Sequence, residues 1–332
     1  MTQYNVIVIG SNCFSGSHFI HGLLTDNAQV LGINRSSEQN DILLPHKHHP
    51  NYNNYRFAQL HVNNNMLEIC NIIQQFKPQY VVNFAAQGMV AESWKDPKQW
   101  FQTNLMSQIE LHEFLRTQSY LQKYVQISTP EVYGTTNGLI KENTNYQPST
   151  PYAVSKASTD MSLMSYRHAY DFPVVFTRAA NVYGPSQQLY RIIPRTVLCV
   201  LLGKRLQLHG GGVSSRSFVH IKDVVRGTIQ IMKDAKPGSI YHIGTDEIIS
   251  IRHLVQTITD MMGVCFEDHV DVMEEDRLGK DMEYRLDWNK IHTEFGWKPT
   301  YNLQQGLEQT IAWIKDNLSV LQTLEMDYIH KL

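Results

Sequence analysis

The strongest constraint on the fold is a regular alternation of short apolar runs with longer amphipathic segments over the first 180 residues. The apolar runs have the length and composition of strands that are buried on both faces of a sheet. The segments between them place apolar residues three and four positions apart, as amphipathic helices do. This alternation predicts an α/β fold with a doubly wound parallel sheet. The predicted strands are 4–10, 29–34, 80–86, 123–129 and 173–179.

The pattern changes near residue 180, where the segments shorten and glycine and proline become more frequent. This change predicts a second, smaller α/β domain that is interleaved with late parts of the large sheet. We expect residues 1–180 and about 217–248 to form the larger domain, and about 181–216 and 249–332 the smaller one. Ligands of such folds bind at the carboxyl ends of the parallel strands, so the cleft between the domains is the expected site.

Composition argues against several classes of protein. The 332 residues carry a formal net charge of −2, without the basic excess of a nucleic-acid-binding chain. No stretch approaches the roughly 18 apolar residues of a membrane span, and the first residues do not resemble a signal peptide. The four cysteines form no closely spaced pair, which is typical of reduced thiols in a cytoplasmic protein. The Asn- and His-rich segment 45–57 predicts a polar surface loop, and no metal site is expected.

The first apolar run leads directly into the turn GSNCFSG and then into a predicted helix. Gly10 and Gly16 stand at the first and third positions of a G-x-x-G-x-x-G turn, and Cys13 takes the middle position. Glycines in such a turn let the backbone approach a pyrophosphate at the N-terminus of the helix. The turn therefore predicts a dinucleotide site. The residues expected to bind the cofactor here are Gly10, Asn12, Cys13, Phe14, Ser15 and Gly16.

The end of the second apolar run indicates which dinucleotide is preferred. A site for NAD usually places a carboxylate here to bind the ribose hydroxyls, whereas this chain has Asn34, Arg35 and Ser36. A guanidinium and a hydroxyl suit a 2′-phosphate. We therefore expect these three residues to bind NADP, with NAD as the alternative.

Tyr152 and Lys156 form a Y-x-x-x-K pair at the start of a predicted helix. A spacing of four residues puts both side chains on one face of the helix. A free phenol has a pKa near 10, and a nearby ammonium and the positive charge of a nicotinamide would lower it. Tyr152 could then act as a general base or acid. Thr129, at the end of an apolar run 23 residues upstream, completes the set.

These motifs together resemble the extended short-chain dehydrogenase/reductase family, in its nucleotide-sugar branch. The motifs that carry the resemblance lie within residues 10–281 and read GSNCFSGSH, NFAAQ, STPEVYG, PYAVSK, NVYGP, RSFVHIKD and DRLGKD. The resemblance implies a Rossmann-type dinucleotide-binding domain with a smaller C-terminal substrate domain. It also implies that Thr129, Tyr152 and Lys156 are catalytic, and that Tyr152 and Lys156 contact the cofactor.

The resemblance implies further binding roles. It implies that Asn104 helps to hold the active-site region together next to the cofactor, and that Arg216 and Arg277 bind the nucleotide diphosphate, for which a fork of donors is suited. The implied cofactor-lining residues after the third predicted strand are Ala85, Ala86 and Gln87. The implied substrate-binding residues are Gln87, Thr129, Asn181, Arg216 and Arg277. The family also forms homodimers through the helices near 94–118 and 151–170, so a homodimer is expected.

The segment STPEVYG indicates which reaction of the branch is carried out. In nucleotide-sugar 4,6-dehydratases the residue two after the catalytic Thr is typically Glu, and here it is Glu131. The residue between them is often Asp, which would protonate the departing C6 hydroxyl, but this chain has Pro130. Our hypothesis is that Glu131 both removes the C5 proton and delivers a proton to the leaving hydroxyl. Pro130 would then rigidify the turn and fix the direction of Glu131.

Other activities stay open on the sequence. Nucleotide-uronate decarboxylases share the S-T-x-E-V-Y-G pattern, 4-epimerases usually lack the Glu, and a 4-ketoreductase needs only Thr, Tyr and Lys. A cofactor-binding protein without turnover could dispense with Tyr152 and Lys156, yet both are present. The nucleotide base is also undecided. The segment NRSS resembles GDP-mannose dehydratases, whereas the later motifs are closer to the dTDP-glucose dehydratase pattern.

Overall fold

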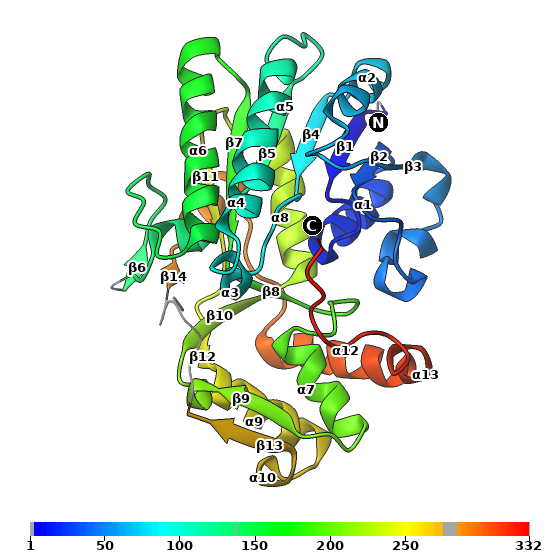
Figure 1. Ribbon diagram of the computed structural model, residues 1–332, viewed down its shortest axis with the longest axis vertical. Helices are drawn as coiled ribbons and strands as arrows, with labels where there is room; N and C mark the ends of the chain where they lie inside the picture. Colours follow the sequence, from blue (N-terminus) through cyan, green and yellow to red (C-terminus); the bar gives the residue numbers. More distant parts are fainter. Residues whose placement is uncertain (1–2, 137, 275–283, 332) are drawn as a thin grey trace.

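The computed structural model describes residues 3–136, 138–274 and 284–331. The chain forms a large lobe built on a parallel sheet and a smaller lobe of helices and short strands (Figure 1). The predicted α/β class is confirmed. Within the described residues no helix is both long and apolar enough to cross a membrane. The same residues hold no group of three or more His, Cys, Asp or Glu side chains placed to bind a metal ion.

The large lobe contains a seven-stranded sheet with the order β11-β7-β5-β4-β1-β2-β3, and its paired neighbours all run parallel. β2 and β3 lie on one side of β1, and the later strands lie on the other side, as in a doubly wound sheet. All five predicted strands are found, one with the predicted bounds and four of them shorter than predicted. The strands are β1 (Asn5–Ile9), β2 (Gln29–Asn34), β3 (Tyr55–Gln59), β4 (Tyr80–Asn83), β5 (Lys123–Ile127), β7 (Val174–Ala179) and β11 (Ile240–Ile243).

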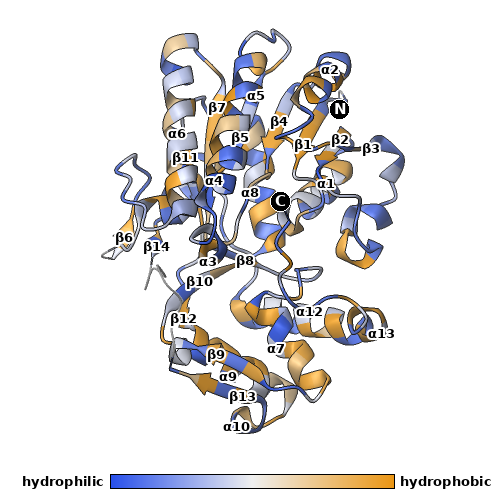
Figure 2. Ribbon diagram, viewed as in Figure 1, coloured by the Kyte–Doolittle hydropathy of each residue, from blue (hydrophilic) through white to orange (hydrophobic). Residues whose placement is uncertain are grey.

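Helices cover both faces of this sheet because alternate strand residues point to opposite faces. Val6 and Val8 of β1 pack into a core with α1 (Phe14–Thr25) and α8 (Ile221–Asp234). Ile7 and Ile9 point to the other face, whose core includes residues of α2 (Met66–Phe76), α5 (Ser107–Leu115) and α6 (Pro151–Tyr170). The strands at the centre of the lobe are accordingly its most hydrophobic part (Figure 2).

The small lobe is joined to the large one through a three-stranded sheet of order β12-β10-β8. Its strands are β8 (Asn181–Tyr183), β10 (Ser215–His220) and β12 (Ile248–Ser250). A second core lies below this sheet, among α7 (Ile192–Leu201), α9 (Ile251–Met262) and α12 (Leu303–Asp316). The remaining elements there are β9 (Leu206–His209), η6 (Gly210–Gly212), α10 (Phe266–His269), β13 (Val270–Met273) and α13 (Leu318–Leu321).

The division into two domains stays a prediction, and one stretch packs differently from it. β14 (Arg285–Leu286) pairs with β6 (Leu139–Ile140), and α11 (Asn289–Phe295) contacts β11. Leu286, Ile291 and Trp297 belong to the core of the large lobe. Residues 285–297 therefore lie against the large lobe, whereas the sequence had placed them in the smaller domain.

Two local expectations differ from the structure. The segment 45–57 is not a simple polar loop, because it forms two short 3₁₀ turns and the first part of the edge strand β3, and His46 within it is fully buried.

The predicted long helix near 94–118 is interrupted. It consists of α4 (Pro97–Phe101), a π-helical turn η4 (Gln102–Met106) and α5, and is preceded by α3 (Val90–Ser93). The other turns are η1 (Asp41–Leu43), η2 (Pro45–His48), η3 (Tyr52–Asn54) and η5 (Pro130–Tyr133).

Candidate active site and cofactor groove

The glycine turn connects β1 to α1 and leaves room only for glycine at two positions. Gly10 has φ +86°, and a Cβ atom on it would lie 2.7 Å from the backbone nitrogen of Ala85. A Cβ atom on Gly16 would lie 2.4 Å from the carbonyl oxygen of Gly10. The turn therefore keeps the N-terminus of α1 open to a close backbone approach, which fits the pyrophosphate of a dinucleotide.

Cys13 serves as the N-cap of α1 in place of the missing glycine. Its sulfur accepts a hydrogen bond from the backbone nitrogen of Gly16 at 3.2 Å. Burial raises the pKa of the Cys13 thiol to about 11. The thiol is therefore uncharged near neutral pH and does not repel a phosphate. Phe14 is buried with its ring edge-on to His18, and Ser15 is half-buried in the first turn of the helix.

The segment after β2 is tied to the glycine turn. The side-chain amide of Asn12 donates to the backbone carbonyls of Ser36 and Ser37, both at 3.1 Å. Asn34 also donates to the carbonyl of Ser36, at 3.1 Å. Arg35 extends from this segment, and its Nη1 donates to the carbonyl of Lys331 at 3.0 Å. The predicted cofactor residues at the ends of β1 and β2 thus form one connected edge.

The segment after β4 is held by Asn104, which lies in the π-helical turn η4. Asn104 Oδ1 accepts a hydrogen bond from the backbone nitrogen of Gln87 at 2.8 Å, and its Nδ2 donates to the Gln87 carbonyl at 3.1 Å. The same Nδ2 lies 2.9 Å from Ser155 Oγ, which in turn donates to the carbonyl of Tyr152. Ala85 donates its backbone N–H to Asn83 at 3.0 Å, and Ala86 is exposed. Asn104 therefore links the groove edge to the helix that carries Tyr152, and π-turns often occur at such functional positions.

The segment STPEVYG is a cap followed by a 3₁₀ turn. Thr129 is the N-cap of η5, and its hydroxyl accepts a hydrogen bond from the backbone nitrogen of Glu131 at 3.3 Å. Pro130 stands at the first position of the turn, where no N–H partner is needed. Gly134 ends the turn with φ +68°. Pro130 therefore lies in the turn that carries Glu131, and its stiffening of that turn stays a prediction.

Tyr152 and Lys156 lie on α6 and face the end of β5. Lys156 is buried and donates to the carbonyl of Ile127, the last residue of β5, at 2.8 Å. Burial lowers the pKa of Lys156 to about 8. Burial also raises the pKa of Tyr152, and the negative charge of Glu131 raises it further, whereas the Thr129 hydroxyl lowers it. The structure therefore brings these four residues together, although the protein groups alone do not lower the pKa of Tyr152 as the sequence analysis expected.

Two predicted substrate-binding residues contact Tyr284. Asn181, the first residue of β8, accepts a hydrogen bond from the hydroxyl of Tyr284 at 2.7 Å. The Arg216 guanidinium lies 5.1 Å from the centre of the Tyr284 ring. The Tyr284 phenol and the positive charge of Arg191 both act on the pKa of Tyr152, so this cluster lies near the Tyr152 hydroxyl. Arg277 lies outside the described residues.

Sequence reasoning missed Arg191 and Tyr284. Arg191 stands just before α7 and Tyr284 closely follows the motif DRLGKD, and neither position by itself predicts a place near Tyr152. Sequence reasoning also missed a buried ion pair behind the site. Asp160 and Arg178 are fully buried and 3.0 Å apart. Ser128 donates to the same carboxylate oxygen at 2.6 Å.

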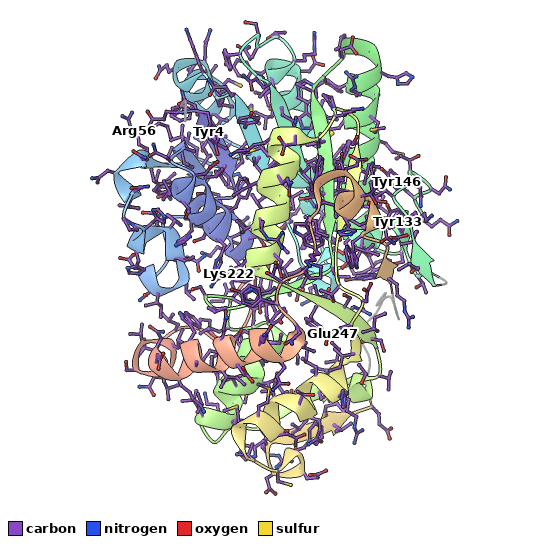
Figure 3. The ribbon with its side chains drawn as sticks, turned by 180° about the vertical axis from the view of Figure 1, so that it is seen from behind. Tyr4, Arg56, Tyr133, Tyr146, Lys222 and Glu247 are labelled. Carbon is purple, nitrogen blue, oxygen red and sulfur yellow. The ribbon has the colours of Figure 1, made fainter. Side chains whose placement is uncertain are left out.

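Two tyrosines enclose the guanidinium of Arg178. It donates to the hydroxyls of Tyr133 and Tyr146 and lies over both rings, at 4.6 and 5.0 Å from their centres. These tyrosines lie close together beside α6 (Figure 3). Because Asp160 is four residues after Lys156 on α6, and Ser128 precedes Thr129, this cluster lies next to two of the residues that the sequence predicted to be catalytic.

Comparison with known proteins gives consistent results. The family model described as GDP-mannose 4,6 dehydratase matches residues 7–310. The chain is 31% identical over 328 residues to dTDP-D-glucose 4,6-dehydratase of Homo sapiens, which covers 96% of this chain and 92% of the relative. A crystal structure of dTDP-glucose 4,6-dehydratase from Bacillus anthracis in complex with NAD has a TM-score of 0.86 and 30% identity, covering 97% of this chain and all (100%) of that chain.

The same fold also supports another activity. UDP-glucuronic acid 4-epimerase from Bacillus cereus, in complex with UDP-glucuronic acid and NAD, has a TM-score of 0.84 and 27% identity, covering 94% of this chain and 99% of that chain. The fold alone therefore does not distinguish dehydration from epimerisation. The family model and the near full-length match to dehydratases distinguish the two activities and indicate dehydration. The chain belongs to the GDP-mannose 4,6 dehydratase family, and it is a nucleotide-sugar 4,6-dehydratase, a lyase of the short-chain dehydrogenase/reductase type that uses a nicotinamide dinucleotide.

Proposed function

We propose that this dehydratase acts on dTDP-glucose and that Thr129, Glu131, Tyr152 and Lys156 carry out the reaction. The product would be the dTDP-linked 4-keto-6-deoxy sugar. The near full-length relatives named dTDP-glucose 4,6-dehydratase support the substrate. The observation that carries the catalytic assignment is that Thr129 connects Glu131 and Tyr152: its hydroxyl accepts a hydrogen bond from the Glu131 backbone at 3.3 Å, and both Thr129 and Glu131 act on the pKa of Tyr152. Groups in this arrangement can act on neighbouring carbons of one sugar ring.

In this proposal Tyr152 removes the proton of the C4 hydroxyl as C4 is oxidised to the ketone. Its pKa is raised by burial and by Glu131, so it holds its proton in the protein alone. The Thr129 hydroxyl opposes this rise and would hold the C4 oxygen beside Tyr152. Lys156, with its ammonium fixed on the Ile127 carbonyl, adds a positive charge at the end of β5. A bound nicotinamide dinucleotide would accept a hydride from C4, return it to C6 and add a positive charge that favours the phenolate.

Glu131 would perform the elimination. The 4-ketone acidifies the C5 hydrogen, the Glu131 carboxylate takes that proton, and the resulting acid protonates the C6 hydroxyl, which leaves as water. The elimination balances with a single carboxyl group, because the proton taken from C5 leaves in the water, so no second acid is needed at position 130. The proton that Tyr152 took from the C4 hydroxyl then remains for C5 when the hydride returns to C6. Pro130 fixes the first position of the turn, and the hydrogen bond from the Glu131 backbone to Thr129 fixes the second. General acid–base catalysis of this kind contributes about 10²–10⁴-fold in rate.

The residues of the glycine turn and of the ends of β2 and β4 would hold the cofactor. We propose NADP as the preferred form because Arg35 and Ser36 follow β2 where an NAD site usually has a carboxylate. The relative from Bacillus anthracis was solved with NAD, which is the alternative. Binding of both dinucleotides to the same preparation decides between them.

We propose that Asn181 and Arg216 hold the nucleotide diphosphate, together with Arg277, and that Gln87 and Thr129 contact the sugar. Asn181 and Arg216 come from neighbouring strands of the three-stranded sheet, and Tyr284 bridges them. This places two polar groups and one positive charge at the border of the lobes, where a diphosphate would lie between the sugar site and the small lobe.

We also propose a homodimer formed through α4 to α6, as the sequence analysis expected. Large apolar side chains on this face are unusually exposed: 43% for Trp94, 51% for Met106, 54% for Met161 and 53% for Tyr170. Such exposure marks an interaction surface, and a second copy of the chain would cover it.

The cytoplasmic location likewise stays a proposal, supported by four cysteines that are all free thiols.

The test of the reaction is mass spectrometry of dTDP-glucose incubated with the purified protein and no added reductant. Loss of one water is expected for the wild type. The Glu131→Gln variant should still oxidise C4, seen as absorbance of the reduced nicotinamide, but should lose water about 10²–10⁴-fold more slowly. Glu68→Gln, on the exposed side of α2, is the matched control and should react normally.

Each other outcome has a specific meaning. Dehydration by Glu131→Gln at the wild-type rate would show that Glu131 is not the elimination base. Water loss from GDP-mannose but not from dTDP-glucose would support the same dehydration chemistry and would show that the proposed substrate, dTDP-glucose, is wrong. Arg191, whose positive charge acts near Tyr152, could bind a sugar carboxylate. Loss of carbon dioxide from UDP-glucuronate would therefore contradict the proposal in favour of a decarboxylase.

A further inference from the structure

The segment 325–331, which we call the strap, leaves the small lobe and ends at the cofactor groove. It follows α13 and rises to the large lobe, where the chain reaches the region of α1 (Figure 1). Its first part is fixed to the small lobe by Arg195 of α7, which donates to the carbonyl of Met326 at 3.0 Å and to Asp327 at 2.7 Å. The Tyr328 ring packs edge-on against Tyr190, with ring centres 5.2 Å apart. The strap therefore starts from an anchored position.

The tip of the strap bridges two edges of the groove. The carbonyl oxygen of Lys331 accepts hydrogen bonds from Gln87 Nε2 at 2.9 Å and from Arg35 Nη1 at 3.0 Å. Gln87 follows β4 and Arg35 follows β2. In the sheet β1 lies between these two strands, and the glycine turn follows β1. A peptide group held from both sides must therefore pass in front of the glycine turn, across the path of the dinucleotide.

His330 fixes the strap to the large lobe. Its ring stacks on Trp100 with ring centres 5.2 Å apart and an angle of 4° between the planes. Its Nε2 forms a hydrogen bond with Gln99 Oε1 at 2.6 Å. A cavity of about 170 Å³ remains between the strap and the α3–α4 region. The strap is thus held by a few specific contacts rather than by a continuous apolar interface, and such a segment can open and close.

We propose that the strap is a cover that lies over the bound dinucleotide and slows its release. The charge of the strap indicates that it covers the bound dinucleotide and does not compete with it for the groove. A segment that imitated a diphosphate would bring a negative side chain to the glycine turn, whereas the strap tip brings the exposed, positive Lys331. A positive charge over the groove attracts the phosphates of the cofactor. Gln87 and Arg35 then hold the cover through the Lys331 carbonyl, in addition to the sugar and cofactor contacts proposed for them, and both lobes enclose the cofactor.

The chemistry of the site gives the cover a purpose, and this step depends on the proposed function. The hydride that leaves C4 returns to C6 of the same sugar, so the cofactor ends each cycle in its starting form. A dehydratase loses nothing by retaining the dinucleotide from one cycle to the next. Retention also prevents loss of the reduced form while the 4-keto intermediate is still bound.

The test measures release of the cofactor directly. The protein is loaded with reduced nicotinamide dinucleotide and mixed with an excess of the oxidised form, and the fall in fluorescence gives the dissociation rate. His330→Ala removes a stacked ring and a hydrogen bond, so release should become about tenfold faster. Lys331→Glu reverses an exposed charge without touching a core and should also speed release. Ile329→Ala is the matched control, because the Ile329 side chain is 60% exposed, and its rate should equal that of the wild type.

Unchanged release in both His330→Ala and Lys331→Glu would overturn the proposal. Tighter binding and slower release in these variants would also overturn it, because that result identifies a competing segment. The assay separates this inference from the reaction itself. A chain that binds the dinucleotide normally, with a strap that affects release, could still fail to dehydrate dTDP-glucose, and that failure would concern the substrate alone.

Discussion

Asp160→Asn should strongly destabilise the protein, although it changes neither the size of the side chain nor a surface group. Asp160 and Arg178 are both completely buried, and one carboxylate oxygen accepts from Arg178 at 3.0 Å and from Ser128 at 2.6 Å. Asparagine keeps an acceptor for these donors but removes the charge that compensates the guanidinium. Leaving one member of a buried pair uncompensated costs about 3–5 kcal/mol. At about 2 °C per kcal/mol for a chain of this size, Tm should fall by roughly 6–10 °C.

Differential scanning calorimetry of the wild type and four variants tests this reasoning. Arg178→Gln should cost a similar amount, and the double variant Asp160→Asn/Arg178→Gln should cost clearly less than the sum, because no lone charge then remains. The control is Asp171→Asn at the end of the same helix. Asp171 pairs with Arg167 but is 93% exposed, so its Tm should hardly change. A fall below about 2 °C for Asp160→Asn, or fully additive costs, would refute the assignment of a coupled buried pair.

The same variant should change the pH dependence of activity. The negative charge of Asp160 raises the pKa of Lys156 and opposes the lowering caused by burial, which together leave it at about 8. Without that charge the pKa of Lys156 falls, so the ammonium is lost at a lower pH. Activity that needs a charged Lys156 should then decline at lower pH in the variant than in the wild type. A pH–rate profile of C4 oxidation measures this shift, and an unshifted alkaline limb would contradict it.

Three further predictions follow from other contacts. Gly16→Ala places a Cβ atom against the carbonyl of Gly10, so dinucleotide binding by calorimetric titration should weaken at least tenfold while the rest of the fold remains. Arg35→Ala should reduce the affinity for NADP more than that for NAD, and an unchanged ratio of the two dissociation constants would exclude a 2′-phosphate contact. Four buried histidines have pKa values lowered by burial to about 3–4, so the unfolded state takes up their protons first as pH falls below about 6.5. Each should cost roughly 1–2 kcal/mol at pH 5, and acid unfolding followed by circular dichroism should begin there. The four are His46, His112, His220 and His242.

The parts of the fold that could be predicted are those that local sequence determines. The five predicted strands are buried on both faces, so they read as continuous apolar runs. β3 was missed because YRFAQ is an edge strand, whose half-exposed residues give no such run. Tyr152 and Lys156 could be paired because four residues on a helix determine which side chains share a face.

The remaining parts of the site depend on contacts between distant segments. Arg191 and Tyr284 come near Tyr152 from different parts of the chain, and no residue spacing in the sequence predicts that the three residues meet. The interruption of the long helix at η4 was also missed, because a π-turn follows from the way Asn104 is held by the segment after β4 rather than from helix propensity. No prediction for the strap could be made from the sequence, because its position depends on contacts with residues that are far away in the chain.

The order in which the strands of the large sheet occur along the chain has a consequence for biosynthesis. β11 completes the sheet beside β7, and α8 packs on α1, but both elements follow the first strands of the small lobe in the chain. A nascent chain that has emerged only as far as residue 180 therefore exposes the unpaired edge of β7 and an uncovered apolar face. Exposed edges and faces of this kind are where aggregation begins. Some sixty more residues must emerge from the ribosome before this lobe can close, so we expect the lobe to fold late and to be prone to aggregation until then.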